Sequence, residues 1–160
     1  MLKLYLFNHF NKMIILYIYD IIKYAMGNVL LFLTPKSAVA YLQDDYTLRQ
    51  AVEKMNFHRY AAVPIIDANG KYVGTITEGD ILWYIYNNDT LSSQYALEEV
   101  QLKDVPRNRD NKAVNASANI SDLFKGAISQ NFVPVVDDSN SFIGIVTRKS
   151  VIEHLIKTQK

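Results

Sequence analysis

The chain has 160 residues, of which 49% are hydrophobic and 21% charged, and its formal net charge is +1. This composition is typical of a globular protein, and we expect one ordinary domain or two small domains that share a core. The near-zero net charge argues against broad electrostatic binding of nucleic acid or acidic membranes. The chain contains no cysteine, which excludes disulfides and thiolate metal sites and fits a reducing, cytoplasmic location.

Residues 1–25 differ in character from the rest of the chain, and we interpret them as an atypical leader. They are rich in Tyr, Ile, Leu and Phe, but the longest uncharged apolar run, residues 13–19, is far shorter than the roughly 20 residues of a membrane span. A helix lying on a membrane has little support, because no clean polar face separates from the apolar one. The alternative is that the native protein starts at Met26. We expect no membrane association.

A helix, a hairpin of two strands and a second helix are predicted next. Apolar residues at helical spacing in residues 48–55, behind Thr47 as the N-cap, predict the first helix. Two short apolar runs, residues 61–66 and 72–77, are separated by turn-forming residues and predict the strands. Apolar residues at helical spacing in residues 81–85 predict the second helix.

The same order recurs 70 residues later in the chain. Val-Pro-Ile-Ile-Asp at residues 63–67 returns as Val-Pro-Val-Val-Asp at 133–137, and the strand at 142–147 matches the strand at 72–77. The first helix repeats at an offset of 72, with Asn119 in the cap position. Each copy therefore reads strand, helix, strand, strand, helix. Because its strands are apolar on both faces, each copy needs a partner related by an approximate two-fold axis.

The repeat divides the chain into four regions. The leader covers residues 1–25, the first motif 26–87, the linker 88–107 and the second motif 108–160. The connection between the motifs contains one helix-like stretch, residues 91–100, and a polar loop long enough to cross the module.

The second strand and second helix of each copy carry a recognisable motif. The residues Gly-Thr-Ile-Thr-Glu-Gly-Asp-Ile-Leu at 74–82 resemble the CBS motif, and residues 144–152 match it except that Ser150 stands where Asp is usual. The resemblance covers about residues 34–157 and indicates a tandem CBS pair, a Bateman module of the stand-alone bacterial type. It implies an α/β fold (an α+β sandwich) of two pseudo-two-fold-related motifs, each with a small sheet flanked by helices. It also implies adenosine-containing ligands.

The resemblance implies clefts that combine strand residues of one motif with the Thr-x-x-Asp loop of the other. In the first cleft, the Thr77 hydroxyl can reach a phosphate or ribose, and Asp80 can accept both ribose hydroxyls. The alternative is that Thr77 only caps the helix and Asp80 favours its N-terminus. Cations for phosphate and a slot for adenine would come from the second motif: Arg109, Lys112, Asn131, Phe132 and Val133. The alternative for the cations is a solvated linker.

The second cleft would combine the entry segment and first strand of one motif with the loop of the other: Ala38, Ala40, Tyr60, Ala61 and Ala62 with Thr147, Arg148 and Ser150. Ser150 leaves a single hydroxyl in place of a carboxylate. Arg148 adds positive charge near a helix N-terminus, which suits a phosphate. Tyr60 would stack on adenine, or be only a core residue. We expect a more phosphorylated or cyclic ligand here, or a vacant cleft.

No catalytic or metal-binding pattern stands out elsewhere in the chain. The three histidines are scattered, and no Ser/His/Asp set or Walker-type Gly-Lys-Ser/Thr is present. We therefore expect no enzyme activity, no metal and no required cofactor.

The predicted function is a regulatory module that binds an AMP-, ADP- or ATP-like nucleotide and signals to an unidentified effector protein. A cyclic di-AMP receptor is the alternative within this class, and a ligand-free dimerisation scaffold is the alternative of another class. Trp83 and Tyr84 are expected to pack against a second copy in a homodimer, because such an aromatic patch is costly to expose. We expect no nucleic-acid partner.

Overall fold

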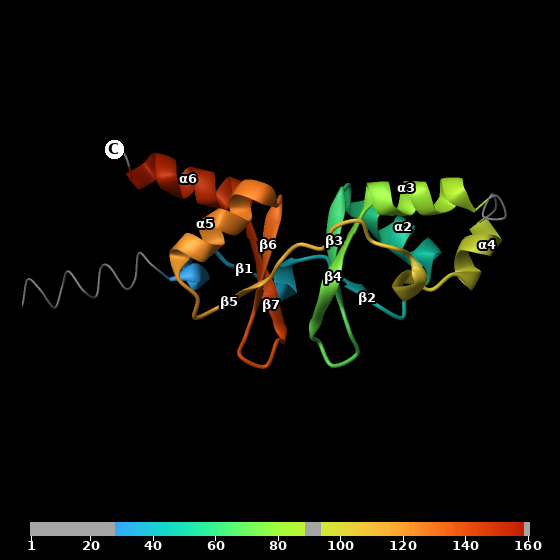
Figure 1. Cartoon of the computed structure of the whole chain (residues 1–160), viewed down its shortest axis with the longest axis horizontal. Coiled ribbons are helices and arrows are strands. Elements are labelled where there is room, and N and C mark those ends of the chain that lie inside the picture. Colours follow the sequence, from blue (N-terminus) through green and yellow to red (C-terminus); the bar gives the residue numbers. More distant parts are fainter. Residues whose placement is uncertain (1–27, 89–93, 159–160) are drawn as a thin grey trace, which may run out of the picture.

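The computed structural model describes residues 28–88 and 94–158, and it contains two copies of the predicted unit (Figure 1). The first copy consists of β2 (Leu42–Gln43), α2 (Leu48–His58), β3 (Ala62–Ile66), β4 (Tyr72–Thr77) and α3 (Glu78–Asn87). The second consists of β5 (Val114–Asn115), α5 (Ile120–Ser129), β6 (Phe132–Val136), β7 (Phe142–Thr147) and α6 (Arg148–Thr158). The predicted order of elements and the α/β fold class are confirmed.

Shorter elements precede and connect the two copies. They are η1 (Val29–Phe32), β1 (Thr34–Pro35) and η2 (Lys36–Ala38) before the first copy, and α4 (Gln94–Glu99) and η4 (Leu102–Asp104) between the copies. The leader at residues 1–25 and the start of the predicted helix-like stretch, residues 91–93, lie outside the described residues. In the part of the chain that the structure describes, no helix is long and apolar enough to cross a membrane.

The residues that begin the helices explain where those helices start. The Thr47 side chain accepts a hydrogen bond from the backbone N–H of Gln50, and the Gln50 side chain accepts one from the N–H of Thr47. This reciprocal capping satisfies two N–H groups that would otherwise lack partners at the start of α2. Asn119 occupies the equivalent position before α5, but its side chain makes no capping bond.

The strands form one sheet in each copy, and the second sheet has an additional strand. The first sheet has the order β2-β3-β4, whereas the second has the order β1-β7-β6-β5. Strand β1 precedes the first copy in the chain but pairs with β7 of the second, with Thr34 opposite Ile145. The outer edge of β7 is therefore covered by a strand, whereas β4 is the outer strand of its sheet.

Each copy has its own buried core. The first core includes Leu42, Leu48, Met55, Val63, Ile65 and Ile76, and the second includes Val29, Phe32, Leu123, Val133, Val135 and Val146. Burial of each large apolar side chain contributes about 1.5–3 kcal/mol. Because η1 supplies Val29 and Phe32 to the second core, the described chain starts on the second copy before it enters the first.

The two copies meet along their hairpins. Figure 1 shows the two sheets side by side, with α3 and α6 on the same side of the molecule and the hairpin turns on the other. The N–H of Phe142 donates to the Gly70 carbonyl at 2.9 Å, and the N–H of Tyr72 donates to the Asn140 carbonyl at 3.2 Å. The rings of Tyr72 and Phe142 also stack, with centroids 6.3 Å apart. These reciprocal contacts between equivalent residues fix the pseudo-two-fold arrangement that the clefts require.

Candidate functional site

A cavity of about 250 Å³ lies between the two copies, and we call it the Thr147 cleft. The entry segment before β2, strand β3, strand β6 and strand β7 all contribute to its lining. The lining residues are Thr34, Ala38, Val39, Ala40, Tyr60, Ala62, Pro64, Asn131, Phe132, Ile145 and Thr147. Both copies therefore build this cavity, as the repeat predicted for an inter-motif cleft.

The lining of the Thr147 cleft is apolar, with a few polar groups. Thr34, Asn131 and Thr147 provide hydroxyl and amide groups, and no residue of the lining is charged at neutral pH. The Tyr60 ring, which is 45% exposed, stacks on the His58 ring with centroids 5.4 Å apart. A cavity of this kind suits a flat apolar ring whose orientation is set by a small number of polar contacts.

The loop that starts α6 borders the Thr147 cleft. The Ser150 N–H donates to the Thr147 hydroxyl oxygen at 3.1 Å, and the Ser150 hydroxyl donates to the Thr147 carbonyl at 2.8 Å. The Thr147 hydroxyl lies 3.2 Å from the Ser150 hydroxyl oxygen. Thr147 thus caps α6 while it lines the cleft, and the Ser150 hydroxyl donates to the Thr147 carbonyl. The expected single hydroxyl of Ser150 is engaged by this turn.

The structure places Arg148 away from the cleft, contrary to its expected role beside a phosphate. Its Nε donates to the Ala127 carbonyl at 2.9 Å and to the Gln130 carbonyl at 3.2 Å. Its side chain lines a groove between α5 and α6 instead. The physical reason is that the last carbonyls of α5 lack helical partners and attract the guanidinium.

The equivalent cleft of the other loop, which we call the Thr77 cleft, has different contents. Asp80 is only 7% exposed. One of its carboxylate oxygens accepts from the Thr77 N–H at 3.0 Å and from the Thr77 hydroxyl at 2.7 Å, and the other accepts from the Asn108 N–H at 2.9 Å. Three hydrogen bonds from the protein thus already use this carboxylate, and its predicted contact with a ribose stays a prediction. Asp80 caps α3 and holds the linker.

The chain segment 107–111 lies along the outer edge of β4 in the Thr77 cleft. The Asp110 carboxylate accepts from the Thr75 N–H at 2.9 Å and from the Arg107 Nε at 2.8 Å. A side chain at Gly74 would overlap this carboxylate, so the glycine is what lets Asp110 approach the backbone of β4. The Tyr72 hydroxyl donates to the Asn111 carbonyl at 2.7 Å and ties the end of the segment to the same strand.

Gln130 occupies the position in the Thr77 cleft that Tyr60 occupies in the Thr147 cleft. It is 8% exposed, and its side-chain amide bonds to both backbone groups of Lys112 at 2.8 and 3.1 Å. The Lys112 backbone is therefore engaged by a buried side chain. By contrast, Tyr60 leaves the equivalent backbone at Ala40 in the wall of a cavity.

Burial raises the pKa of Tyr72 to about 12, although a hydrogen bond with Thr75 partly opposes the shift. The nearby Asp110 carboxylate raises this pKa further, because it disfavours a second negative charge. Tyr72 therefore stays protonated and donates to the 107–111 segment throughout the neutral range.

The structure separates the other residues predicted for the first cleft. Asn131 and Phe132 line the Thr147 cleft instead, beside Ala62 of the opposite copy. Val133 is fully buried in the second core and does not reach either cleft, because adjacent strand residues point to opposite faces. Arg109 and the Lys112 side chain are exposed, as in the solvated-linker alternative. Ala61, predicted beside Ala62, is exposed outside the lining.

The entry segment 36–40 was predicted to line this cleft, and Ala38, Val39 and Ala40 do so, but sequence reasoning missed three other lining residues: Thr34, Pro64 and Ile145. Pro64 and Ile145 come from the repeated hairpins, and alternation along the predicted strands would have placed them beside Ala62 and Thr147. Thr34 is in β1, whose pairing with the opposite copy gives no local sequence signal.

Comparisons with known proteins agree with this architecture. A family model described as CBS domain matches residues 33–87 and 102–157. The protein named Cyclic di-AMP receptor B of Bacillus subtilis strain 168 is 28% identical over 130 residues, covering 79% of this chain and 84% of that protein.

Two solved structures illustrate the structural similarity. A CBS domain protein from Streptococcus pneumoniae TIGR4 superposes with a TM-score of 0.72 at 28% identity, covering 81% of this chain and 86% of that one. The CbpB protein of Listeria monocytogenes in complex with c-di-AMP superposes with a TM-score of 0.69 at 25% identity, covering 79% and 92%. The folds therefore agree over most of both chains.

Proposed function

Since the chain belongs to the CBS-domain family, we propose that it is a regulatory module that binds an adenine nucleotide in the Thr147 cleft and signals to a partner protein. The Thr147 cleft carries this proposal, because it is a cavity built by both copies. Its apolar walls fit a purine ring, and Asn131 and Thr147 provide polar groups for the base or the sugar. Arg148 donates to the Ala127 carbonyl, so we do not assign it to the phosphates of the ligand.

Cyclic di-AMP is the first ligand to test within this class. One relative is named as a receptor for it, and the Listeria structure contains it. AMP, ATP and S-adenosylmethionine share the adenosine group that the cavity would hold, so they complete the set of probes.

We assign binding rather than catalysis to the cleft. Among its lining residues only Tyr60 has a titratable side chain, so the cavity offers no pair of groups for acid–base chemistry. Among the residues that the structure describes, no cluster of three or more His, Asp or Glu side chains is arranged to hold a metal ion. We propose that the nucleotide acts as a regulatory ligand of a cytoplasmic protein.

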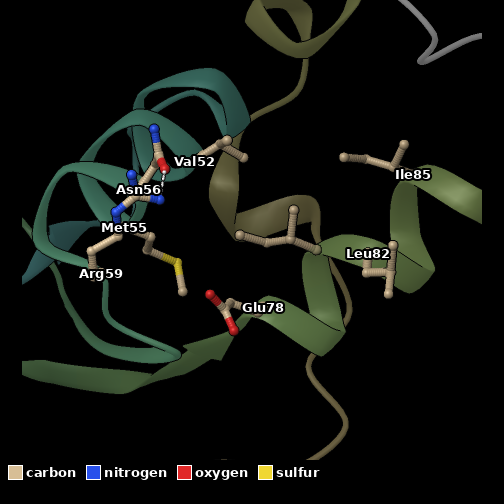
Figure 2. Close-up of a pocket in the computed structure, with 8 residues that line it drawn as sticks. Val52, Met55, Asn56, Arg59, Glu78, Leu82 and Ile85 are labelled. Atoms are coloured by element: carbon tan, nitrogen blue, oxygen red, sulfur yellow. Dashed lines mark hydrogen bonds between the residues drawn. The ribbon is translucent and has the colours of Figure 1, made fainter.

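We propose that a second copy of the chain covers the helical face. An apolar groove of about 290 Å³ lies between α2 and α3, and Figure 2 shows Val52, Leu82 and Ile85 around it. An equivalent groove lies between α5 and α6, with Ile128 82% exposed and Ile152 49% exposed. A pair of similar grooves related by the pseudo-two-fold axis suits a symmetric partner.

Two of the three aromatic side chains of α3, Trp83 and Tyr86, are exposed, and the third, Tyr84, is not. Trp83 and Tyr86 are 60% and 72% exposed, and their rings meet edge to face with centroids 5.9 Å apart. Tyr84, which was expected beside them, is partly buried and packs against the first core. The reason is helical spacing: Tyr84 follows Asp80 and Ile81 on the inward side of α3.

Titration calorimetry of the full chain with cyclic di-AMP, AMP, ATP and S-adenosylmethionine tests the ligand. We expect saturable binding of at least one of them, and loss of that binding in Ala40→Trp, which fills the Thr147 cleft. Ala68→Trp is the matched control, because Ala68 is exposed in the β3–β4 turn. No binding by any of the four ligands would contradict the proposal and favour the ligand-free scaffold.

A further inference from the structure

We infer that the Thr77 cleft is closed by the chain's own 107–111 segment, so that each chain holds one ligand molecule, in the Thr147 cleft. The inference rests on the proposed function for the identity of the ligand. The closure itself rests on contacts of Asp80, Asp110 and Gln130 that do not depend on any ligand.

The Asp80 carboxylate is the acceptor that a ribose would need in the Thr77 cleft. Both carboxylate oxygens of Asp80 already accept hydrogen bonds from the protein, and the side chain is 7% exposed. The protein therefore occupies three of the about four acceptor positions of this carboxylate, which leaves a ribose at most one of them.

The entry segments of the two copies differ at equivalent positions. At the repeat offset of 72, Ala38 corresponds to Asp110, and Thr34 corresponds to Pro106. Thr34 is part of β1, which covers the edge of β7 with a strand and leaves the small Ala38 in the cavity wall. Pro106 lacks the N–H that a paired strand supplies. The Asp110 carboxylate covers the edge of β4 instead, through the Thr75 N–H.

One ion pair and two sets of hydrogen bonds hold the 107–111 segment in place. The Arg107–Asp110 pair is partly exposed, with side chains 20% and 44% accessible, and such pairs contribute little alone. The Tyr72–Asn111 and Gln130–Lys112 hydrogen bonds hold the segment at its other end. Removing Asp110 should therefore open the cleft locally without unfolding the segment. It also removes a negative charge that repels phosphate and frees Arg107.

Equilibrium dialysis counts the ligand molecules bound per chain, with AMP and cyclic di-AMP as separate probes. We expect about one molecule of either probe per chain in the unmodified protein and about two AMP molecules in Asp110→Ala, with the second site within about tenfold of the first in affinity. Asp122→Ala is the matched control, because Asp122 forms an exposed ion pair with Lys125 on α5 and lies outside the 107–111 segment. This control should bind one molecule of the probe per chain.

Hydrogen exchange of the Thr75 amide is the second measurement, and it needs no ligand. We expect this amide to be protected in the unmodified protein and to exchange at least tenfold faster in Asp110→Ala, with Asp122→Ala unchanged. Two ligand molecules per unmodified chain, or a Thr75 amide that exchanges equally fast in both proteins, would overturn the inference. So would an Asp110→Ala protein in which the Thr75 amide exchanges faster but only one AMP binds per chain. If no probe binds to any variant, the proposed function fails, while Thr75 exchange still decides whether the cleft is closed.

Discussion

The Thr147 and Thr77 clefts are built from equivalent residues of one repeat, yet their contents differ: the first is a cavity between the copies, whereas the cavity at Asp80 lies between α3 and residues 106–108. Ala38 and Tyr60 border the first, whereas Asp110 and Gln130 stand at the equivalent positions of the second. The hairpins repeat in both clefts, whereas the entry segment forms β1 against β7 in the first and no regular element before β5 in the second. The difference shows that the entry segment and a few side chains decide whether a repeated fold leaves room for a ligand or fills that room itself.

Asp80 and Ser150, in the first turns of α3 and α6, also differ between the copies, but here the residue that matches the family motif belongs to the Thr77 cleft. Asp80 matches the family motif and Ser150 does not, yet Asp80 is engaged by Thr77 and Asn108. Ser150 instead supports the wall of the open cleft. A residue that matches a motif can therefore serve the structure in one copy, while the copy that departs from the motif retains the cavity.

The largest expected effect comes from making the open cleft resemble the closed one. Ala38→Asp places a carboxylate in the Thr147 cleft, where β1 already pairs with β7. Desolvation of this carboxylate by the bound ligand, together with its repulsion of phosphate, should weaken nucleotide binding more than 100-fold, about 3 kcal/mol. Titration calorimetry measures this, with Ser37→Asp as the control because Ser37 is an exposed neighbour outside the lining. Equal loss in both variants would contradict the role given to Ala38.

Substitutions at Gln130 and Tyr60, which occupy equivalent positions of the two copies, test stability and binding separately. Gln130→Ala removes the partners of both Lys112 backbone groups, so we expect a loss of about 2 kcal/mol in the free energy of unfolding. Tyr60→Ala should cost less than about 1 kcal/mol, because Tyr60 is 45% exposed, but should weaken nucleotide binding about tenfold. Urea unfolding and calorimetry measure the two effects. A destabilised Tyr60→Ala with unchanged binding would reverse the assignment of the two positions.

Tyr72 allows a test by pH, because burial raises the pKa of its hydroxyl. Phe142, the equivalent residue of the second copy, has no hydroxyl. Between pH 10 and about 12 the unfolded chain loses the Tyr72 proton while the folded chain keeps it, since burial raises the pKa to about 12. Folding stability from this group is fully present below pH 10 and decreases by about 1–2 kcal/mol as the pH rises through that window. The advantage of the unmodified protein over Tyr72→Phe in urea unfolding should therefore narrow from pH 9 to pH 11. A constant difference would show that the hydroxyl is not buried as described.

The smallest expected effect comes from restoring the motif in the second copy. Ser150→Asp places a carboxylate in the first turn of α6, where it can accept from the Thr147 N–H as Asp80 does from Thr77. We expect a gain of about 0.5 kcal/mol in stability and a higher melting temperature by calorimetry. Lys149→Asp serves as a comparison for charge alone, because Lys149 is largely exposed. A larger gain from Lys149→Asp would show that the helix dipole, rather than the capping contact, is responsible.

The sequence predicted the parts of the fold that depend on local pattern. The repeat at 70 residues, the capping by Thr47 and the two hairpins all follow from short segments, and all are confirmed. The placement of Asn131 and Phe132 in one cleft rather than the other depends on how the two copies face each other. A single copy carries no signal for that arrangement.

The contacts of Asp80 and Asp110 lay beyond sequence reasoning for a different reason. They depend on the backbone path of residues 106–112, which forms no regular element before β5. The Asn108 N–H and the Thr75 N–H become available only in the folded chain. The one local signal that could have been used is Pro106 opposite Thr34 in the repeat, because proline cannot supply the N–H of a paired strand.

Amide chemical shifts of the full chain during titration with cyclic di-AMP, and then with AMP, test the central claim most directly. We predict that the amides of Val39, Ala40, Ala62 and Phe132 shift on binding, whereas those of Thr75 and Asn108 keep their positions. Shifts centred on Thr75 and Asn108, with the Thr147 cleft unchanged, would contradict the account.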